Sequence, residues 1–348
     1  MKKLLKAARV GSFALILAIF AIILAFADIG KMADAFIGIK WRWAIWVPLL
    51  NLANTFVEGL RLAIILLPVS ARFELRNCFT SVLVGIMGNI MLPLRFGDGA
   101  RAYYIAKTEK ISLAGSFSAL MLDRIADFVL FFALMAITAV LYPFPPSVTK
   151  TGLTACFIFA ATIAAIFALA GLGSRLGRNS SGKIRRRIAE EVSKFMNGLS
   201  VVRNAGLVFP IILTSALSWL LRALMLWCIF EAFSLDLPFM AAPIVLILLS
   251  FGIALVSTPA NLGGFEIAIA GTLNQLFSVE IEVALSCAVA LHAIEVAPTV
   301  AFAMIYLWFE GFKTAEILKT ANEMGKEQPP QEPPDASHTS EGGQSSRI

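Results

Sequence analysis

Charged side chains are scarce in this sequence of 348 residues. Lys, Arg, Asp and Glu together make up 15% of it, whereas hydrophobic residues make up 58% and the mean hydropathy is +0.81. A typical soluble domain has about 25% charged residues. The composition therefore excludes an ordinary soluble domain. It predicts an all-α, polytopic bundle of membrane helices, because a helix satisfies its own backbone hydrogen bonds in lipid.

The residues that build metal and nucleophilic sites are also few. There are only two histidines, one of them His338 near the C-terminus, and the four cysteines lie singly in apolar runs without a C-x-x-C spacing. We therefore expect no metal site and no disulfide. A P-loop motif is absent, so the chain carries no ATPase of that type. We expect no catalytic residue, no cofactor and no nucleic-acid partner.

The apolar segments divide the chain into about eight hydrophobic stretches. The first, residues 10–27, ends in Ala-Phe-Ala, which imitates a signal-peptide cleavage site, but its length favours an uncleaved helix. The others are residues 43–69, 78–92, 113–142, 151–172, 207–233, 243–256 and 283–309, with a shorter apolar piece at 267–277. Residues 1–319 are predicted to form one membrane domain. Residues 320–348 are rich in Pro, Ser and Gly and are predicted to be a disordered cytoplasmic tail.

Basic residues gather in alternate connections between these stretches. They occur at the N-terminus, near residues 72–76 and 107–110, in the connection 175–203, and near residues 313–319. The positive-inside rule then places both termini in the cytoplasm, provided that residues 78–110 enter and leave the membrane on that side. The connection 175–203 also has apolar residues at helical spacing, so an amphipathic surface helix and a solvated basic loop both remain open.

A first break in the helical pattern lies between residues 88 and 101. Proline and glycine interrupt a helix there, and open backbone or an unpaired charge facing lipid costs several kcal/mol. The segment is therefore predicted to be buried in protein or to line a polar cavity. Its polar residues are Asn89, Arg95, Asp98 and Arg101, and its helix-breaking residues are Pro93, Gly97 and Gly99.

A second break, residues 257–266, follows a similar plan. A proline comes first, a glycine pair follows, and an acidic residue opens a short helical piece; these residues are Pro259, Gly263, Gly264 and Glu266. Two re-entrant hairpins that face opposite sides of the membrane would form an inverted repeat, which places a binding site near the midplane. The sequence similarity between the two breaks is weak, so the repeat is a hypothesis.

The chemistry of the first break suits an anion. Arg95 and Arg101 can each present a planar fork of donors to a phosphate, and a helix beginning near Asp98 would aim free N–H groups at it. The alternative interpretation is that Asp98 forms ion pairs with these arginines and staples the hairpin together. Both can hold.

Further ionisable residues lie inside the predicted spans, where they usually face a bundle interior. Glu58 and Arg61 are three residues apart, close enough to pair on one helix face. Arg124 and Asp127 have the same spacing, with Asp123 adjacent, and form either an internal pair or an anchor for an arginine of the first break.

The second half of the chain offers candidates for proton transfer. Glu266 is either a helix cap or a site of proton or cation coupling, and His292 and Glu295 face the same side of the last span. They could relay a proton, although a lone hydrogen-bonded histidine is the simpler interpretation. For Arg222 the sequence does not decide between a cavity and the membrane surface.

Three motifs together carry a resemblance to a known family. The pattern N-x-x-x-P-x-R-x-G-D/E-x-x-R-A is met from Asn89 to Ala102, an Arg with an acidic residue three later is met by Arg124 and Asp127, and P-x-x-x-G-x-x-E is met from Pro259 to Glu266. The sequence resembles the transmembrane region of lysylphosphatidylglycerol synthase, a flippase-like family of bacterial and archaeal membrane proteins. A glycine often follows the late proline in that family, whereas Ala260 stands here.

The resemblance implies the handling of a lipid in the bacterial inner membrane. Two-part members of the family carry a soluble aminoacyl-transferase domain, which the segment after residue 309 cannot supply. We therefore expect a protein that translocates or binds an anionic lipid, such as a phospholipid, a polyprenyl phosphate or a hopanoid-related lipid. The alternatives are a membrane enzyme that modifies a headgroup, with Asp98 or Glu266 as base, and a scaffold for enzymes of a lipid pathway. The oligomeric state is not predicted.

Overall fold

The computed structural model describes residues 29–68, 73–91, 96–142, 204–255 and 258–309, with scattered residues between 150 and 195. The elements assigned in this part of the chain are all helices, as the composition predicts. The first predicted span, the basic connection 175–203 and the C-terminal tail lie outside the described residues, as does most of the predicted span 151–172.

Four long apolar helices form the frame of the described part. They are α4 (Trp46–Leu66), α7 (Leu113–Leu141), α10 (Ala205–Ala232) and α13 (Ile281–Phe309). At 1.5 Å per residue, each is long enough to cross a hydrocarbon layer of about 30 Å. The four candidate spans, which include the short α3 (Trp41–Ala44) ahead of α4, agree with four of the predicted stretches.

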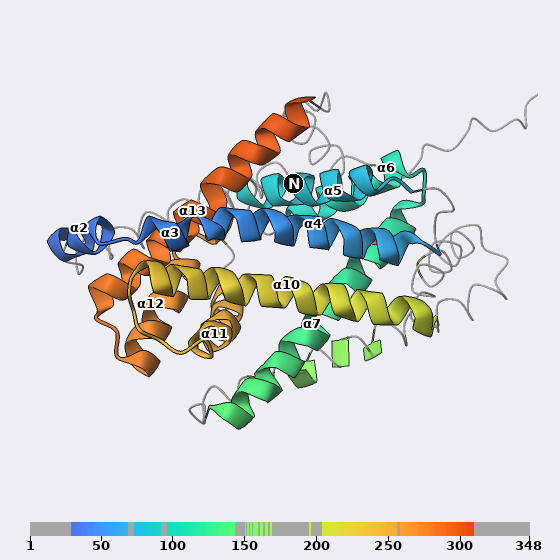
Figure 1. The fold of residues 1–348 in the computed structure, drawn as a ribbon. Helices are drawn as coiled ribbons and strands as arrows, with labels where there is room; N and C mark the ends of the chain where they lie inside the picture. Colours follow the sequence, from blue (N-terminus) through green and yellow to red (C-terminus); the bar gives the residue numbers. More distant parts are fainter. Residues whose placement is uncertain are drawn as a thin grey trace, which may run out of the picture.

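Helices α4 and α10 lie side by side and run in opposite directions (Figure 1). Just before α3 and α4, the backbone N–H of Lys40 donates to the carbonyl oxygen of Ala232 at the end of α10 over 2.9 Å. Further along the pair, Arg61 of α4 donates to Ser215 of α10. These two contacts fix the antiparallel register of this pair. The short helix α2 (Ile29–Ile37) precedes them and packs against α13.

The first break joins two short helices, α5 (Leu75–Met91) and α6 (Phe96–Thr108), that pack against each other. A methyl group added at Gly88 would lie 2.6 Å from the Cα atom of Gly97, so only glycines allow this approach. The side-chain oxygen of Asn89 accepts the backbone N–H of Gly97 over 2.9 Å and satisfies a donor at the start of α6. Asn89 and Gly97 therefore hold the tip of the hairpin closed.

The second break joins α11 (Ala241–Leu255) to α12 (Gly264–Phe277) through the short 3₁₀ helix η2 (Pro259–Asn261). Here too a small residue permits close packing, because a methyl group on Gly252 would lie 2.6 Å from the Cβ atom of Ala268. The turn needs a left-handed backbone at Ala260 and Asn261, with φ of 54° and 59°. Ala260 thus adopts the conformation for which a glycine is best suited.

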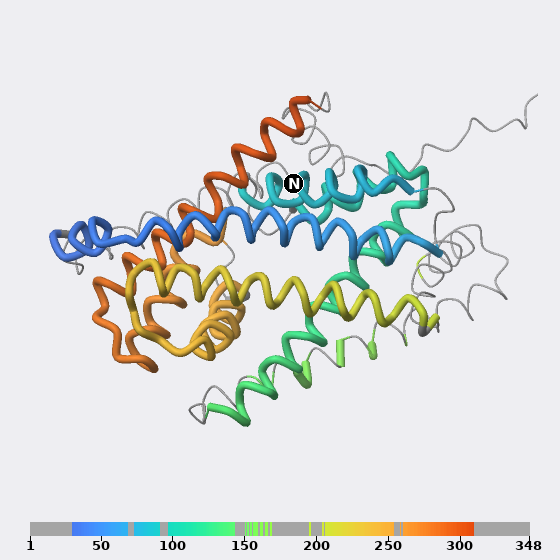
Figure 2. The backbone as a smooth tube through the Cα atoms, viewed as in Figure 1, coloured from blue at the N-terminus to red at the C-terminus, as the bar shows by residue number. Residues whose placement is uncertain are grey.

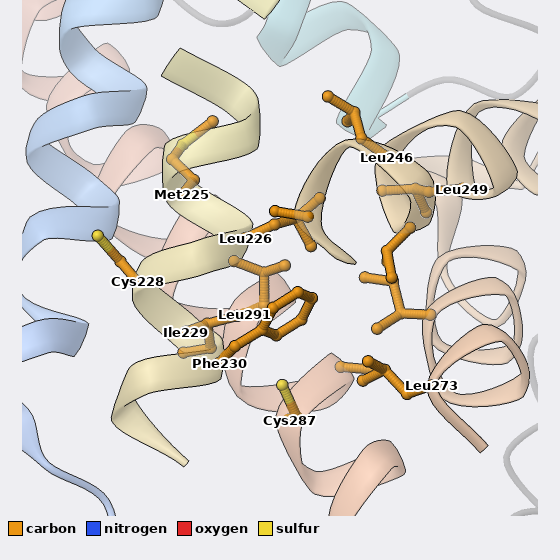
Figure 3. Close-up of a cluster of buried hydrophobic side chains, with 14 of the residues drawn as sticks. Met225, Leu226, Cys228, Ile229, Phe230, Leu246, Leu249, Leu273, Cys287 and Leu291 are labelled. Atoms are coloured by element: carbon orange, nitrogen blue, oxygen red, sulfur yellow. The ribbon is translucent and has the colours of Figure 1, made fainter. Parts of the chain in front are cut away.

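An apolar core fills the space between α10, α11, α12 and α13 (Figure 3). Two of the free cysteines, Cys228 and Cys287, are buried in it among leucine, isoleucine and phenylalanine side chains. Both therefore pack as small hydrophobic residues, in keeping with the apolar runs in which the cysteines lie in the sequence. The labelled side chains of the cluster are Met225, Leu226, Cys228, Ile229, Phe230, Leu246, Leu249, Leu273, Cys287 and Leu291.

The order of a long helix, a short hairpin and a long helix occurs twice along the described chain. Helices α4, α5, α6 and α7 have this order, and helices α10, α11, α12 and α13 have it again. Because α4 and α10 are antiparallel and the connections are short, the two hairpins join the bundle from opposite ends (Figure 2). Segment η2 of the second hairpin packs against α5 of the first. The two breaks therefore belong to hairpins that meet inside the bundle.

Candidate functional site

A buried guanidinium group lies where α4, α7 and α10 meet. Arg61 is only 1% exposed, yet its side chain donates to Asp123 over 2.5 Å, to Asp127 over 2.6 and 3.2 Å, and to the hydroxyl of Ser215 over 3.0 Å. A buried charge is tolerable only when it is paired and hydrogen-bonded in this way. Arg61 thus joins the first half of the described chain to α10 of the second.

The first hairpin enters the same network through Arg101 of α6. Its Nη1 donates to Asp123 over 3.1 Å, so Asp123 is shared by two arginines, and its methylene groups pack against Gly85. Arg101 is 4% exposed, and its Nε and Nη2 have no hydrogen-bond partner among the described residues. The arginine therefore keeps two buried donors for an acceptor that the described side chains do not supply.

The network becomes accessible at its edge between α6 and α7. Arg124 donates to Asp98 over 3.0 Å, and these side chains are 42% and 37% exposed. Arg124 also lies 3.8 Å from Asp127, the pair that the sequence spacing suggests. In the alternative interpretation, Asp98 pairs with an arginine of its own break. The partner that the structure describes is Arg124 of α7, and Arg95 lies outside the described residues. The hairpin is thus fastened to the neighbouring long helix.

A second branch connects α4 with α10. Glu58 accepts hydrogen bonds from Arg222 over 2.5 Å and from Asn54 over 3.1 Å, and Ser218 donates to Asn54 over 2.6 Å. The prediction that Glu58 pairs with Arg61 is corrected here. The two side chains do lie in the same region of α4. That region packs against α7, which supplies carboxylates to Arg61, and against α10, which supplies Arg222 to Glu58.

The four arginines of this network face an equal number of carboxylates. The basic members are Arg61, Arg101, Arg124 and Arg222, and the acidic members are Glu58, Asp98, Asp123 and Asp127. The network is therefore balanced without a ligand. An added anion would have to take the place of a carboxylate or use the spare donors of Arg101.

A separate cluster closes the second break. Glu266 accepts the backbone N–H of Gly263 over 2.7 Å, which caps α12, and its other oxygen lies 2.6 Å from His292 Nδ1 on α13. The other ring nitrogen, Nε2, lies 2.9 Å from the carbonyl oxygen of Ala260. A carbonyl only accepts, so Nε2 carries a hydrogen, and the pair Glu266–His292 holds one further proton between its two atoms.

Glu295 lies on the same helix as His292. It sits one turn after His292 on α13, and the charges of His292, Arg222 and Glu58 act on its carboxyl group. Its backbone carbonyl accepts a hydrogen bond from Asn51 of α4 over 3.1 Å. The observed hydrogen-bond partner of His292 is Glu266 rather than Glu295, so a relay through Glu295 would need a further step.

Most of the predicted site residues lie in the described part of the chain. Asp98, Arg101, Arg124 and Asp127 belong to the network, Asn89 and Gly97 to the hairpin tip, and Gly99 to the first turn of α6. Pro259, Gly263, Gly264 and Glu266 form the second turn with His292. Pro93 and Arg95 lie outside the described residues.

Sequence reasoning left out the two serines of α10 that complete the network beside Arg222. Ser215 and Ser218 bond to Arg61 and Asn54, and Arg222 follows Ser218 by four residues on the same helix. The spacing Ser-x-x-Ser-x-x-x-Arg inside an apolar helix marks one polar face. This polar face was the sequence signal that could have indicated that α10 takes part in the network.

Comparison with known proteins agrees with the sequence motifs. Residues 10–303 match the family model described as the lysylphosphatidylglycerol synthase TM region. The chain belongs to this family. It is also 24% identical over 271 residues to a UPF0104 membrane protein of Methanocaldococcus jannaschii, which covers 72% of this chain and 79% of the relative. No solved structure gives a significant match.

The region that matches the lysylphosphatidylglycerol synthase TM family includes both hairpins and all eight charged residues of the network. The matched region ends at residue 303, within α13. The chain is therefore a multi-pass membrane protein of this family, and its polar groups lie in the part that defines the family.

Proposed function

We propose that this protein binds an anionic lipid headgroup at the pair Asp98–Arg124 and moves the lipid across the bacterial inner membrane. One observation carries the proposal. This half-exposed ion pair lies at the edge of a network whose centre, Arg61 and Asp123, is buried, and it joins a short hairpin to a long apolar helix. Charged groups in such a position are costly unless they face a water-filled cavity or a polar ligand.

Arg124 is the member of the network best placed to bind a phosphate. Its shorter contact, 3.0 Å, is the one to Asp98, its contact with Asp127 is 3.8 Å, and its side chain is 42% exposed. A phosphate that approached this exposed edge would replace Asp98 as the partner and gain a planar pair of donors. The buried neighbours Asp123 and Asp127 would keep the guanidinium in place.

The two hairpins supply a route for movement. Helices of 13 to 17 residues are shorter than a complete span, so we interpret both hairpins as re-entrant. They join antiparallel halves, and with both termini in the cytoplasm the first would enter from the cytoplasmic side and the second from the outer side. Paired hairpins of this kind would form the inverted repeat expected of alternating access around a midplane site.

An assay of lipid movement between the two leaflets of liposomes tests the proposal. The purified protein is reconstituted with fluorescent phosphatidylglycerol, and movement between leaflets is followed for the wild type, Arg124→Ala and Arg101→Ala. We expect Arg124→Ala to abolish transport and Arg101→Ala to weaken it. The matched control is Arg42→Ala, which removes an exposed arginine of α3 outside the network. Transport by Arg124→Ala at the wild-type rate would refute the site.

The same preparation separates the alternatives. A membrane enzyme would produce a new lipid species, which chromatography of the extracted lipids detects. A scaffold for a lipid-pathway enzyme would neither move nor modify the lipid when reconstituted alone.

A further inference from the structure

One complete edge of the Arg101 guanidinium group has no partner. Nη1 donates to Asp123, whereas Nε and Nη2 make no hydrogen bond to the described residues. The N–H of Nε and one N–H of Nη2 lie on the same side of the planar group, so this open edge is a fork of two parallel donors. Such a fork matches the two oxygens of a carboxylate or a phosphate. Arg101 is 4% exposed, so bulk solvent does not satisfy the fork.

The neighbouring arginine shows that this region can satisfy a guanidinium group completely. All three nitrogens of Arg61 donate, Nε to Asp123, Nη1 to Asp127 and Ser215, and Nη2 to Asp127. Arg61 and Arg101 are both buried and share Asp123, so they differ in their partners and not in their surroundings. A buried donor without a partner is destabilising, and a charged donor more so. The open edge of Arg101 therefore requires an acceptor from outside the described residues.

Arg101 belongs to the inner of two ion pairs that join α6 to α7. The outer pair, Asp98–Arg124, is half-exposed, and the inner pair, Arg101–Asp123, is buried. Asp98 and Arg101 are three residues apart on α6, while Asp123 and Arg124 are adjacent on α7. The two pairs are therefore about one helical turn apart. A group that displaces Asp98 from Arg124 thus lies about one turn from Arg101.

The charge balance of the network limits what can bind at these two arginines. Its arginines and carboxylates are equal in number, and Asp98 is the most exposed of the carboxylates, so it is the one that can turn to water. A ligand with one negative charge restores the balance when it takes the place of Asp98. A phosphomonoester carries about 1.5 to 2 negative charges at neutral pH and leaves an excess. A phosphodiester carries one, so the balance favours it.

We infer that the open edge of Arg101 is an inner binding site for the phosphate of a phosphodiester lipid, which enters it after displacing Asp98 from Arg124; this rests on the proposed function. The two non-bridging oxygens of the phosphodiester accept from Nε and Nη2, while Nη1 keeps its bond to Asp123. Asp98 turns to water, so its link between α6 and α7 is broken. The outer arginine captures the headgroup, and the inner one selects a headgroup with a single charge.

Binding to the purified protein in detergent tests the inference without depending on transport. The ligands are short-chain phosphatidylmethanol, phosphatidic acid with the same acyl chains, and inorganic phosphate, and the rise of Tm with ligand concentration gives each affinity. The two lipids differ by one methyl group, which converts a phosphomonoester into a phosphodiester, and inorganic phosphate lacks the lipid. At neutral pH we expect phosphatidylmethanol to bind several-fold more tightly than phosphatidic acid, and inorganic phosphate to bind most weakly.

Arg101→Lys is the matched variant, because lysine keeps the charge that pairs with Asp123 but has no planar fork. We expect it to bind phosphatidylmethanol about tenfold more weakly and to lose the preference for the phosphodiester. Arg42→Lys, on the exposed surface of α3, should change neither. Equal affinities of the wild type and Arg101→Lys would overturn the inference, and this is the result that a fork occupied by water would give. Tighter binding of phosphatidic acid or of inorganic phosphate would overturn it as well.

A measurement on the wild type decides if Arg101→Lys does not fold. A phospholipid with a diazirine on its headgroup alcohol is photocrosslinked to the protein, and the labelled residues are identified by mass spectrometry. Gly85 of α5 contacts the methylene groups of Arg101. We expect labels at Gly85 and in the first turns of α6, several-fold above the exposed face of α10. Labels absent from these positions would overturn the inference.

The binding and the transport assays can fail separately. Binding that depends on Arg101, in a protein that moves no lipid, would remove the proposed function and leave a lipid-binding site. Transport that needs Arg124, combined with binding that is the same in Arg101→Lys, would retain the proposed function and remove the inner site.

Discussion

The two breaks in the helical pattern are held in different ways. The first hairpin is fastened by ion pairs to α7, since Asp98 and Arg101 at the start of α6 pair with Arg124 and Asp123. The second is fastened at its tip, where a single histidine of α13 reaches both Glu266 and the carbonyl of Ala260. The first arrangement leaves an exposed ion pair and spare donors, whereas the second satisfies both ring nitrogens of His292.

This difference distinguishes the first region, which could bind a headgroup, from the second, whose polar groups are already paired. The network around Asp123 has an edge where a headgroup can replace a carboxylate, so its partners can change. The cluster around His292 is buried, and its groups already have partners. We therefore expect substitutions in the first region to affect transport and stability to different degrees, and substitutions in the second to act mainly on stability.

The largest effect on stability is expected from Asp123→Asn. Asp123 is 1% exposed and is shared by Arg61 and Arg101, so the amide would leave two buried guanidinium groups short of a negative charge. Removing one partner of a buried ion pair costs about 3–5 kcal/mol. Unfolding in detergent, followed by circular dichroism against increasing denaturant, measures the change.

The control for this variant is Asp98→Asn at the exposed edge. An exposed pair contributes about 0–1 kcal/mol, so the loss should be much smaller. Equal losses from the two substitutions would contradict the distinction between a buried centre and an open edge.

The next effect concerns the closed cluster. His292→Leu would leave a carboxylate oxygen of Glu266 and the carbonyl of Ala260 without their donor. An unsatisfied buried group costs about 1–3 kcal/mol, so the free energy of unfolding should fall by that order. His292→Gln, which retains one donor group, should lose less. Hydrogen exchange of the segment 258–266 would locate the change, and exchange unaffected by His292→Leu would speak against a fastening role.

An effect of similar size is expected where the first hairpin packs most closely. The methyl group of Gly88→Ala would lie 2.6 Å from the Cα atom of Gly97, so α5 and α6 must separate. Overpacking of this kind costs about 1–3 kcal/mol. Gly271→Ala on α12 is the matched control, because nothing lies within 4 Å of the added methyl group there. That variant should be neutral or slightly stabilising, and equal behaviour of the two would contradict the close approach.

Sequence patterns predicted the helices and breaks better than the partners of the charged side chains. Four long spans and both breaks follow from apolar runs interrupted by Pro, Gly and charged residues, since lipid forbids open backbone at such positions. Spacing along one helix pointed to the pairs Glu58–Arg61 and His292–Glu295. The observed hydrogen bonds instead join Arg61 to α7 and His292 to α12. Residues close in sequence share a face, but the helix packed against that face determines the partner.

The left-handed turn at Ala260 offers the finest test of the second break. Its φ of 54° is unfavourable for a residue with a Cβ atom, by about 1–2 kcal/mol, whereas glycine adopts it freely. Glycine also increases the entropy of the unfolded chain, which removes up to about 1 kcal/mol of the gain. Ala260→Gly should therefore stabilise the protein slightly, and the same denaturant titration used for Asp123→Asn measures it. A clear loss of stability would mean that the methyl group of Ala260 contributes packing at the tip, in addition to the carbonyl that binds His292.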